Sequence, residues 1–191
     1  AGGLKNVKNN MRIPENINYI LGQSKEYATI GAEQLSISPD DKRLVSIGYP
    51  SQDVFYDNDY EEIKKVTKRK FKKVILWMPT FRKGGGYNRN DSIKEQKLGI
   101  PLIQSIDSYN YINNILKELD ILLIIKIHPK QNLEDLKIGD LSNIIVLTGE
   151  KVKTINVDNY KLMKCTDALI SDYSSATYDY LQLDKPIAYV L

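Results

Sequence analysis

Polar side chains that could bind a phosphate follow three apolar segments of the sequence. They are Thr80 and Arg82, then Lys126 and His128, then Asp172, Ser174 and Ser175. Hydroxyls, backbone amides, a lysine and an arginine are the groups that a pyrophosphate needs. An imidazole among them could move a proton or stabilise charge on a phosphoryl oxygen. The three segments therefore predict a site for a phosphate-containing ligand.

The stretch Asp167–Leu191 carries the densest of these clusters. Ala168–Ile170 has the pattern of a buried strand, and a helix with apolar positions between Ala176 and Leu183 is expected after it. Ser174 or Ser175 would cap that helix, and its free N–H groups and dipole would face an anion at the end of the strand. Serine caps are more often purely structural, so the structural and the phosphate-binding interpretations both stay open here.

His128 is the only histidine, and it directly follows Ile121–Ile127, the most hydrophobic segment of the chain. Parallel strands deliver the residues at their carboxyl ends to the ligand crevice of an open α/β sheet. A lone histidine is more often structural than catalytic. Its position beside Lys126 nevertheless makes His128 a candidate for proton transfer.

The order of the expected elements predicts an α/β fold with a doubly wound, Rossmann-like parallel sheet. The expected strands are 17–21, 43–47, 74–78, 121–127, 143–147, 168–170 and 187–191. The expected helices are 25–35 after an N-cap at Ser24, 61–73, 107–119 with Asp107 as the cap, 160–165 and the one that follows Ser175. We expect Val74–Met78, Ile121–Ile127, Asn143–Leu147 and Ala168–Ile170 to share one sheet with helices on both faces. The polar strand ends would then converge.

The amino-acid composition limits the classes of protein to which the chain can belong. The chain has 191 residues, 42% of them hydrophobic and 27% charged, which is ordinary for a soluble domain. A net charge of +3 suits an anionic ligand without requiring one. The single cysteine, Cys165, excludes a disulfide within the chain and fits a reducing compartment. The chain lacks an initiator Met and halts on an apolar strand, so we expect both ends to be cuts through a longer protein.

Several other functions find no support in the sequence. Gly84–Gly86 lacks the helix and spacing of a dinucleotide fingerprint, and there is no Walker A loop, no serine-hydrolase elbow and no His/Cys metal cluster. No aromatic and basic ribbon indicates a nucleic-acid partner. The basic run Lys64–Lys73 is most simply a solvated helix face, and an anionic membrane surface is its second interpretation. No apolar run approaches the ~20 residues of a membrane span.

The polar strand ends also resemble the motifs of a known family. Ser171–Ile187, SDYSSATYDYLQLDKPI, is similar to the signature segment of the CDP-glycerol glycerophosphotransferases, the teichoic-acid and capsule polymerases and primases of bacteria. Trp77–Arg82 (WMPTFR) resembles their Pro-Thr-aromatic-Arg, and Ile125–Pro129 (IKIHP) resembles their Lys-x-His-Pro. Gly48–Pro50 is similar to the start of their Gly-x-Pro-Arg-Asn-Asp loop, and Gly3–Lys5 to the tail of their His-Gly-Thr-x-Leu-Lys segment.

This resemblance implies a two-lobed GT-B architecture that moves glycerol phosphate from CDP-glycerol to a teichoic-acid-like or capsule polymer. Residues 1–50 would end the N-terminal, acceptor-side lobe and its linker, and residues 51–191 would be a truncated C-terminal donor-binding lobe. CDP-glycerol would be a substrate, with no cofactor and no metal, and the acceptor would be an anionic polyol-phosphate polymer. The family resemblance also implies a cytoplasmic enzyme, peripheral on the inner face of the cell membrane.

The resemblance also assigns roles to residues of this chain. His128 would stabilise or protonate the leaving phosphate, or serve as a base. Asp179, one helical turn beyond Ser175, would accept hydrogen bonds from donor hydroxyls. The candidate substrate-binding residues are Pro79, Thr80, Arg82, Lys126, Ile127, Asp172, Ser174, Ser175 and Asp179, with Lys5 as a further candidate.

The chain departs from the family pattern in the loop that begins at Gly48 and in the loop after Arg82, and it ends before the family's domain would. Ser51 and Gln52 stand where the family has Arg-Asn, which removes a guanidinium that would pair with a phosphate. Glycerol phosphate, ribitol phosphate or another capsule unit therefore stays open as the transferred group, as does the activity of this fragment alone. A UDP-sugar-dependent GT-B glycosyltransferase or epimerase, and a non-catalytic nucleotide-binding module, are the alternative functions.

Overall fold

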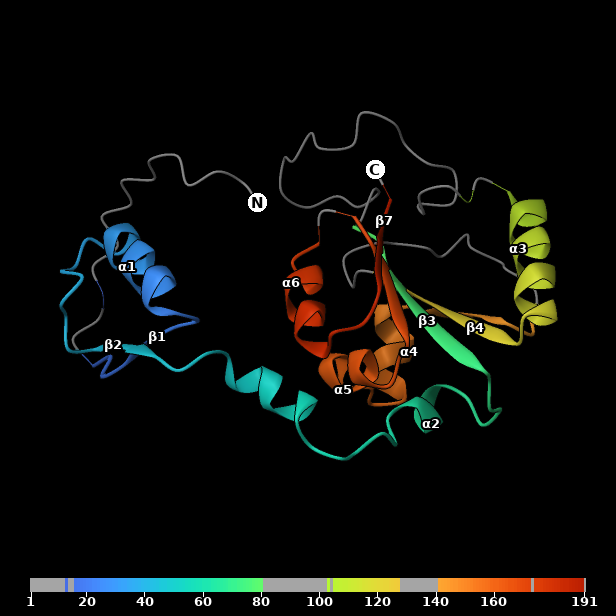
Figure 1. The fold of residues 1–191 in the computed structure, drawn as a ribbon, viewed down its shortest axis with the longest axis horizontal. Coiled ribbons are helices and arrows are strands. Elements are labelled where there is room, and N and C mark those ends of the chain that lie inside the picture. The colour runs from blue at the N-terminus through green and yellow to red at the C-terminus, as the bar shows by residue number, and fades with distance from the viewer. Residues whose placement is uncertain are drawn as a thin grey trace. The chain divides into compact units, whose positions relative to one another are not determined.

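The structure is a computed structural model, and it describes residues 13, 16–80, 103, 105–127, 141–172 and 174–190. The chain forms two compact units, residues 1–56 and 57–191. The predicted lobe boundary after residue 50 stays a prediction; in the structure, the first unit continues through the 3-10 helix Pro50–Phe55. Figure 1 shows the elements of both units.

The first unit contains a small β-α-β arrangement. Strand β1 (Ile20–Gly22) pairs in parallel with β2 (Leu44–Ser46), and helix α1 (Lys25–Gln34) connects them. Ser24 caps α1 as predicted, because its hydroxyl accepts the Tyr27 N–H at 3.3 Å. A Cβ on Gly22 would lie 2.7 Å from the Ala28 Cβ. A glycine is therefore required where the strand packs against the helix.

The second unit is built on a five-stranded parallel sheet with the order β5-β4-β3-β6-β7. Its strands are β3 (Lys73–Met78), β4 (Ile121–Lys126), β5 (Ile144–Leu147), β6 (Ala168–Ser171) and β7 (Ile187–Tyr189). Strands β3 and β4 are almost continuously apolar, as expected for strands that are covered on both faces. The predicted parallel α/β sheet is confirmed.

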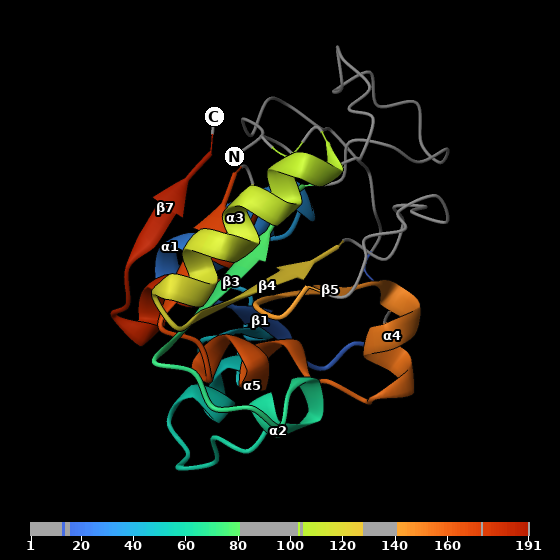
Figure 2. The same cartoon turned by 90° about the vertical axis from the view of Figure 1, so that its right-hand side faces the viewer.

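Helices cover both faces of this sheet (Figures 1 and 2). Helix α3 (Ile106–Glu118) lies on one face, where its Tyr109 and Leu116 pack with Trp77 and Ile125. Helix α5 (Asn159–Lys164) lies on the other face, and α4 (Gly149–Thr154), which the sequence did not predict, follows β5. Helix α6 (Ala176–Tyr180) and a 3-10 turn (Leu181–Leu183) connect β6 with β7.

Three predicted elements differ from the structure. The helix expected over 61–73 is only α2 (Ile63–Val66), because the chain is already extended at Thr67 and the basic residues beyond it lead into β3. The cap of α3 is Ser105 rather than Asp107, since the Ser105 hydroxyl accepts the Ser108 N–H at 3.1 Å. The first strand begins at Ile20, three residues later than predicted.

The basic run Lys64–Lys73 is therefore not one face of a helix. Several of its cations are held by acidic residues of the same unit: Lys64 by Glu61, Lys65 by Glu62, Arg69 by Asp120 and Lys73 by Asp167. Arg69 also lies over the Phe71 ring, 4.4 Å from its centroid. No helix within the described residues has the length and apolarity that a bilayer crossing requires.

Candidate functional site

The carboxyl ends of the strands of the second unit lie in register, and we name this side of the sheet the carboxyl edge. Met78 on β3 pairs with Ser171 on β6, and Lys126 on β4 pairs with Leu147 on β5. Trp77 pairs with Ile125, so Met78 and Lys126 stand in the same row of the sheet. Thr80 and Asp172 come directly after this row. The sheet thus brings three of the predicted groups, Lys126, Thr80 and Asp172, to one edge.

Thr80 and Asp172 are joined directly. The Thr80 N–H donates to both carboxylate oxygens of Asp172, at 3.0 and 3.1 Å, and the Thr80 hydroxyl bonds to the same carboxylate. Asp172 is only 6% exposed, whereas Thr80 is partly exposed. A buried carboxylate that accepts three hydrogen bonds is well satisfied. The pair therefore fixes the chain that leaves β3 against the chain that leaves β6.

Lys126 is a buried cation at the same edge. It is 7% exposed, and its side chain makes no hydrogen bond or ion pair with any residue that the structure describes. Burial lowers the pKa of its ammonium group, because desolvation penalises the charged form. Buried charges in proteins are usually paired or neutralised. A lysine in this setting is suited to an anionic ligand that supplies the missing partner.

Ser174 and Ser175 lie at the start of α6. The Ser174 hydroxyl accepts the Ala176 N–H at 3.3 Å, and Ser175, the N-cap residue, is exposed and makes no capping bond with its side chain. Helix α6 has 5 residues and continues only as a 3-10 turn, so the predicted contribution of a helix dipole to phosphate binding is small. The hydroxyls remain the groups through which this turn could bind an oxyanion.

The other candidates differ in what they can offer. Ile127 is 1% exposed and packs in the core on the α3 side, and its N–H donates to the Leu147 carbonyl at 3.0 Å, so only its own carbonyl remains for a ligand. Pro79 is buried, and Asp179 on α6 is partly exposed. Arg82, His128 and Lys5 lie outside the described residues, and their predicted roles stay predictions.

A second carboxylate joins the same two strands at their opposite ends. Asp167, just before β6, accepts the Val74 N–H of β3 at 2.8 Å and the Lys73 ammonium at 2.8 Å. Burial opposes ionisation of Asp167, but these two hydrogen bonds outweigh it and hold its pKa below the ordinary value. The sequence did not predict this role of Asp167. The only signal was an aspartate on each side of a short apolar strand, at positions 167 and 172.

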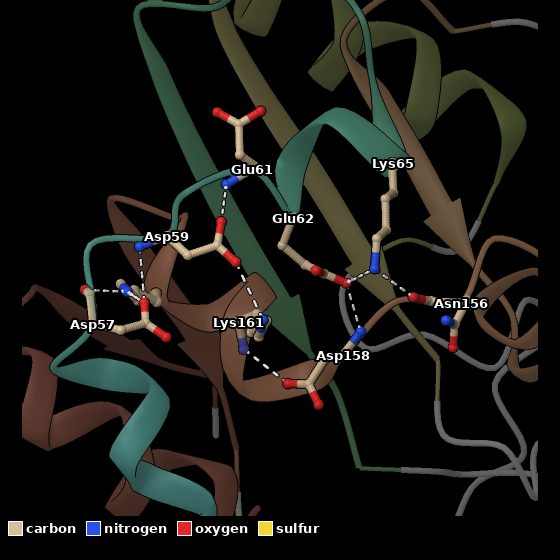
Figure 3. A network of polar contacts seen from close by, with 9 residues as sticks. Asp57, Asp59, Glu61, Glu62, Lys65, Asn156, Asp158 and Lys161 are labelled. Atoms are coloured by element: carbon tan, nitrogen blue, oxygen red, sulfur yellow. Dashed lines mark hydrogen bonds and ion pairs between the residues drawn. The ribbon is translucent and has the colours of Figure 1, made fainter.

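A polar network ties the segment that precedes α2 to the turn that enters α5 (Figure 3). Glu62, 4% exposed, accepts the Asp158 N–H at 2.7 Å and the Lys65 ammonium at 2.9 Å. Lys161 on α5 donates to Asp59 at 3.2 Å. Lys164, at the end of α5, is 1% exposed and is held by Asp57. The network therefore anchors the helix that leads into β6 and Asp172.

Comparison with known proteins places the chain in a family. The profile of the family described as CDP-Glycerol:Poly(glycerophosphate) glycerophosphotransferase matches residues 2–191. The chain is 29% identical to a teichoic acid glycerol-phosphate primase of Bacillus subtilis, over 98% of this chain and 45% of that protein. It is 29% identical to a teichoic acid poly(glycerol phosphate) polymerase of Staphylococcus epidermidis, over 77% of this chain and 19% of that protein.

The chain is also similar to a relative named for ribitol phosphate and to a solved structure. A teichoic acid ribitol-phosphate primase of Bacillus spizizenii is 26% identical, over 78% of this chain and 35% of that protein. The structure of the wall teichoic acid polymerase TagF matches with a TM-score of 0.56 and 25% identity, over 89% of this chain and 38% of that chain. The chain thus spans less than half the length of each of these relatives. The match over residues 2–191 shows that the chain belongs to the CDP-glycerol glycerophosphotransferase family.

Proposed function

We propose that this chain is the donor-binding part of an enzyme that transfers glycerol phosphate from CDP-glycerol to an anionic polyol-phosphate acceptor. Membership of the family and the names of the relatives support this proposal over a UDP-sugar enzyme or a non-catalytic module. According to this proposal, the unit 57–191 belongs to the donor lobe, and the unit 1–56 belongs to the acceptor-side lobe of a two-lobed GT-B enzyme. CDP-glycerol is then a substrate, and no cofactor is needed.

The observation that carries the proposal is the buried Lys126 at the carboxyl edge, without a partner among the described residues. A pyrophosphate would provide the missing negative charge, and charge-assisted hydrogen bonds to such a group are about twice as strong as neutral ones. The hydroxyls of Ser174 and Ser175 would bind the remaining phosphate oxygens.

The reaction that follows from this donor is a displacement at phosphorus. An acceptor hydroxyl attacks the phosphorus that carries glycerol, the bond from that phosphorus to the oxygen of the CMP phosphate breaks, and CMP leaves. The proton of the acceptor hydroxyl must be removed, and charge on the leaving phosphate must be stabilised. His128 is the proposed group for one of these tasks. Lys126 would lie on the side of the leaving phosphate.

Ribitol phosphate is the second candidate for the transferred group. The ribitol-phosphate primase matches 78% of this chain at 26% identity and the glycerol-phosphate primase 98% at 29% identity, so both polyols occur among its relatives. The choice between priming and polymerising is equally open. The donor is therefore proposed as a CDP-linked polyol, with glycerol preferred because it is the polyol of the family description.

Variants of Ser175 and His128 in the full-length enzyme test the proposed roles. Ser175→Ala should weaken CDP-glycerol binding, because loss of one hydrogen bond to a charged group costs about 1.5–3 kcal/mol. His128→Ala should lower turnover about 100-fold or more with donor affinity nearly intact, as expected of a general acid or base. Thermal stability is measured on the same preparations. Near-normal turnover of a folded His128→Ala enzyme would remove His128 from the mechanism.

Association with an anionic membrane surface is a further part of the proposal. Lys68, Lys70 and Lys72 are exposed, and their side chains form no ion pair with any part of the chain that the structure describes. Each lysine near an anionic surface contributes about 1 kcal/mol. Replacing all three with Glu should abolish flotation of the full-length protein with anionic liposomes at low salt. Unchanged flotation of the variant would exclude this use of the charges.

A further inference from the structure

We propose that Asp172 is a positioning residue that makes Thr80 a hydrogen-bond acceptor for a hydroxyl or amino group of the bound nucleotide donor. The inference rests on the proposed function, because it concerns how the same site distinguishes parts of CDP-glycerol. It assigns to Thr80 a different task from that of Lys126 and the serines. They bind phosphate oxygens, and Thr80 recognises a group that carries a proton.

The direction of the hydrogen bond between the two side chains follows from the chemistry of its partners. An ionised carboxylate has no proton to give, so it only accepts. Asp172 already accepts the Thr80 N–H through both of its oxygens, at 3.0 and 3.1 Å. The bond between the Thr80 hydroxyl and the same carboxylate therefore uses the proton of the threonine. The buried position of Asp172, 6% exposed, keeps water from competing for this bond.

The commitment of this proton decides which ligand groups Thr80 can bind. A hydroxyl has one proton and two lone pairs. With its proton on Asp172, Thr80 Oγ1 offers only lone pairs, and a fully ionised phosphate oxygen, which also only accepts, gains nothing from it. A ribose hydroxyl, a glycerol hydroxyl or the cytosine amino group can donate to it. Thr80 is partly exposed at the carboxyl edge, so a ligand can reach it.

The chain contains a matched control for this inference. Asp167 joins the same two strands through a carboxylate that accepts a backbone N–H of β3, but at the opposite end of β6. Its second partner is the Lys73 ammonium rather than a hydroxyl. Asp167→Ala should therefore weaken the same strand pair without altering recognition at the carboxyl edge.

The experiment compares donor analogues in the full-length enzyme. Dissociation constants are measured by calorimetry for CDP-glycerol and for analogues that each lack one ribose hydroxyl, one glycerol hydroxyl or the cytosine amino group. The protein variants are Thr80→Val, which keeps the shape and removes the hydroxyl, Thr80→Ser, which restores it, and Asp172→Ala and Asp167→Ala, which each remove one carboxylate. Thermal unfolding of each variant is recorded alongside.

Thr80→Val should bind CDP-glycerol about five- to tenfold more weakly, the scale of one hydrogen bond. For one analogue, the wild-type and Thr80→Val affinities should be equal, because the missing group is the one that donates to Thr80. Thr80→Ser should restore discrimination of that analogue. Asp172→Ala, which removes the acceptor of the threonine proton, should lose the same discrimination, and Asp167→Ala should keep it even where its melting temperature falls further.

Two results would overturn the inference. If Thr80→Val weakens the binding of CDP-glycerol and of every analogue by the same factor, Thr80 contacts a group common to all of these ligands, such as the phosphates. If Thr80→Val binds all ligands like the wild type, Thr80 takes no part in recognition. Both results leave the proposed donor intact. If the wild-type enzyme itself fails to bind CDP-glycerol, the proposed function fails and this inference fails with it.

Discussion

Removal of the Glu62 carboxylate should destabilise the second unit measurably, although Glu62 touches no proposed ligand. Glu62 is 4% exposed and is the acceptor for the Asp158 N–H at 2.7 Å, where the chain enters α5 (Figure 3). It also accepts from Lys65 at 2.9 Å. Glu62→Ala leaves the Asp158 N–H without its acceptor. Because α5 leads into β6, loss of this contact should also reduce the stability of β6 and of Asp172 after it.

The expected magnitude follows from the two hydrogen bonds. Loss of a hydrogen bond to a charged group costs about 1.5–3 kcal/mol. The Lys65 ion pair adds little, because the Lys65 side chain is 41% exposed, still donates to the Asn156 carbonyl at 2.7 Å, and can be solvated. Glu62→Ala should therefore lower the free energy of unfolding by about 2–3 kcal/mol. Glu62→Gln keeps a neutral acceptor and should cost about half as much.

Urea unfolding of the chain followed by tryptophan fluorescence measures this loss. Trp77 is the only tryptophan, is 4% exposed and lies in the core of the second unit, so its emission reports that unit. The matched control is Glu61→Ala: Glu61 pairs with Lys64 on the surface, with side chains 68% and 63% exposed. It should change stability by less than about 0.5 kcal/mol. Equal urea midpoints for Glu62→Ala and Glu61→Ala would show that the buried Glu62 contributes no more to stability than an exposed ion pair.

Two further predictions concern a buried lysine and two glycines. Lys126→Met should stabilise the ligand-free chain at neutral pH while weakening CDP-glycerol binding of the full-length enzyme at least tenfold, since the burial that lowers the pKa of Lys126 penalises its charge. Between the lowered pKa of Lys126 in the folded chain and its unfolded pKa near 10.4, the unfolded state binds more protons than the folded state. The free energy of unfolding of the wild type should therefore rise with pH in this range because of Lys126. Identical pH dependence of the urea midpoints of the wild type and Lys126→Met would contradict this. Gly22→Ala should destabilise the first unit by about 1–3 kcal/mol because of the contact with Ala28, whereas Gly31→Ala, with open space around its Cβ, should stabilise α1 by about 0.5–1 kcal/mol. Native-state hydrogen exchange of α1 measures both, and equal protection in the two variants would contradict the packing argument.

The strands of the second unit could be predicted because burial on both faces leaves a strong pattern. Val74–Met78 is a run of apolar residues and Ile121–Ile127 is interrupted only by Lys126, and the structure places β3 and β4 there within one residue at each end. The predicted convergence of the strand ends followed from parallel pairing, and the register of Lys126 and Ser171 confirms it. Local pattern and tertiary structure agree where the hydrophobic effect dominates.

Helix boundaries and polar contacts were harder to predict, for identifiable reasons. Charge order suggested a helix over 61–73, but Glu62 and Lys65 are used in tertiary contacts and the chain then extends toward β3. Helix ends carry residues with positive φ, such as Asp120 and Asn156, where glycine is the usual signal. The bond between Thr80 and Asp172 joins residues far apart in the sequence. No local pattern encodes such a contact, although each residue had been named as a candidate.

Donor selectivity of the full-length enzyme tests the proposed function. The measurement is equilibrium binding of CDP-glycerol, CDP-ribitol and UDP-glucose by calorimetry, with wild type and Lys126→Met side by side. The proposed function predicts that a CDP-linked polyol binds more tightly than UDP-glucose, with glycerol preferred, and that Lys126→Met weakens this binding at least tenfold, because Lys126 pairs with the pyrophosphate. Preference for UDP-glucose, or unchanged CDP-glycerol affinity in Lys126→Met, would contradict it.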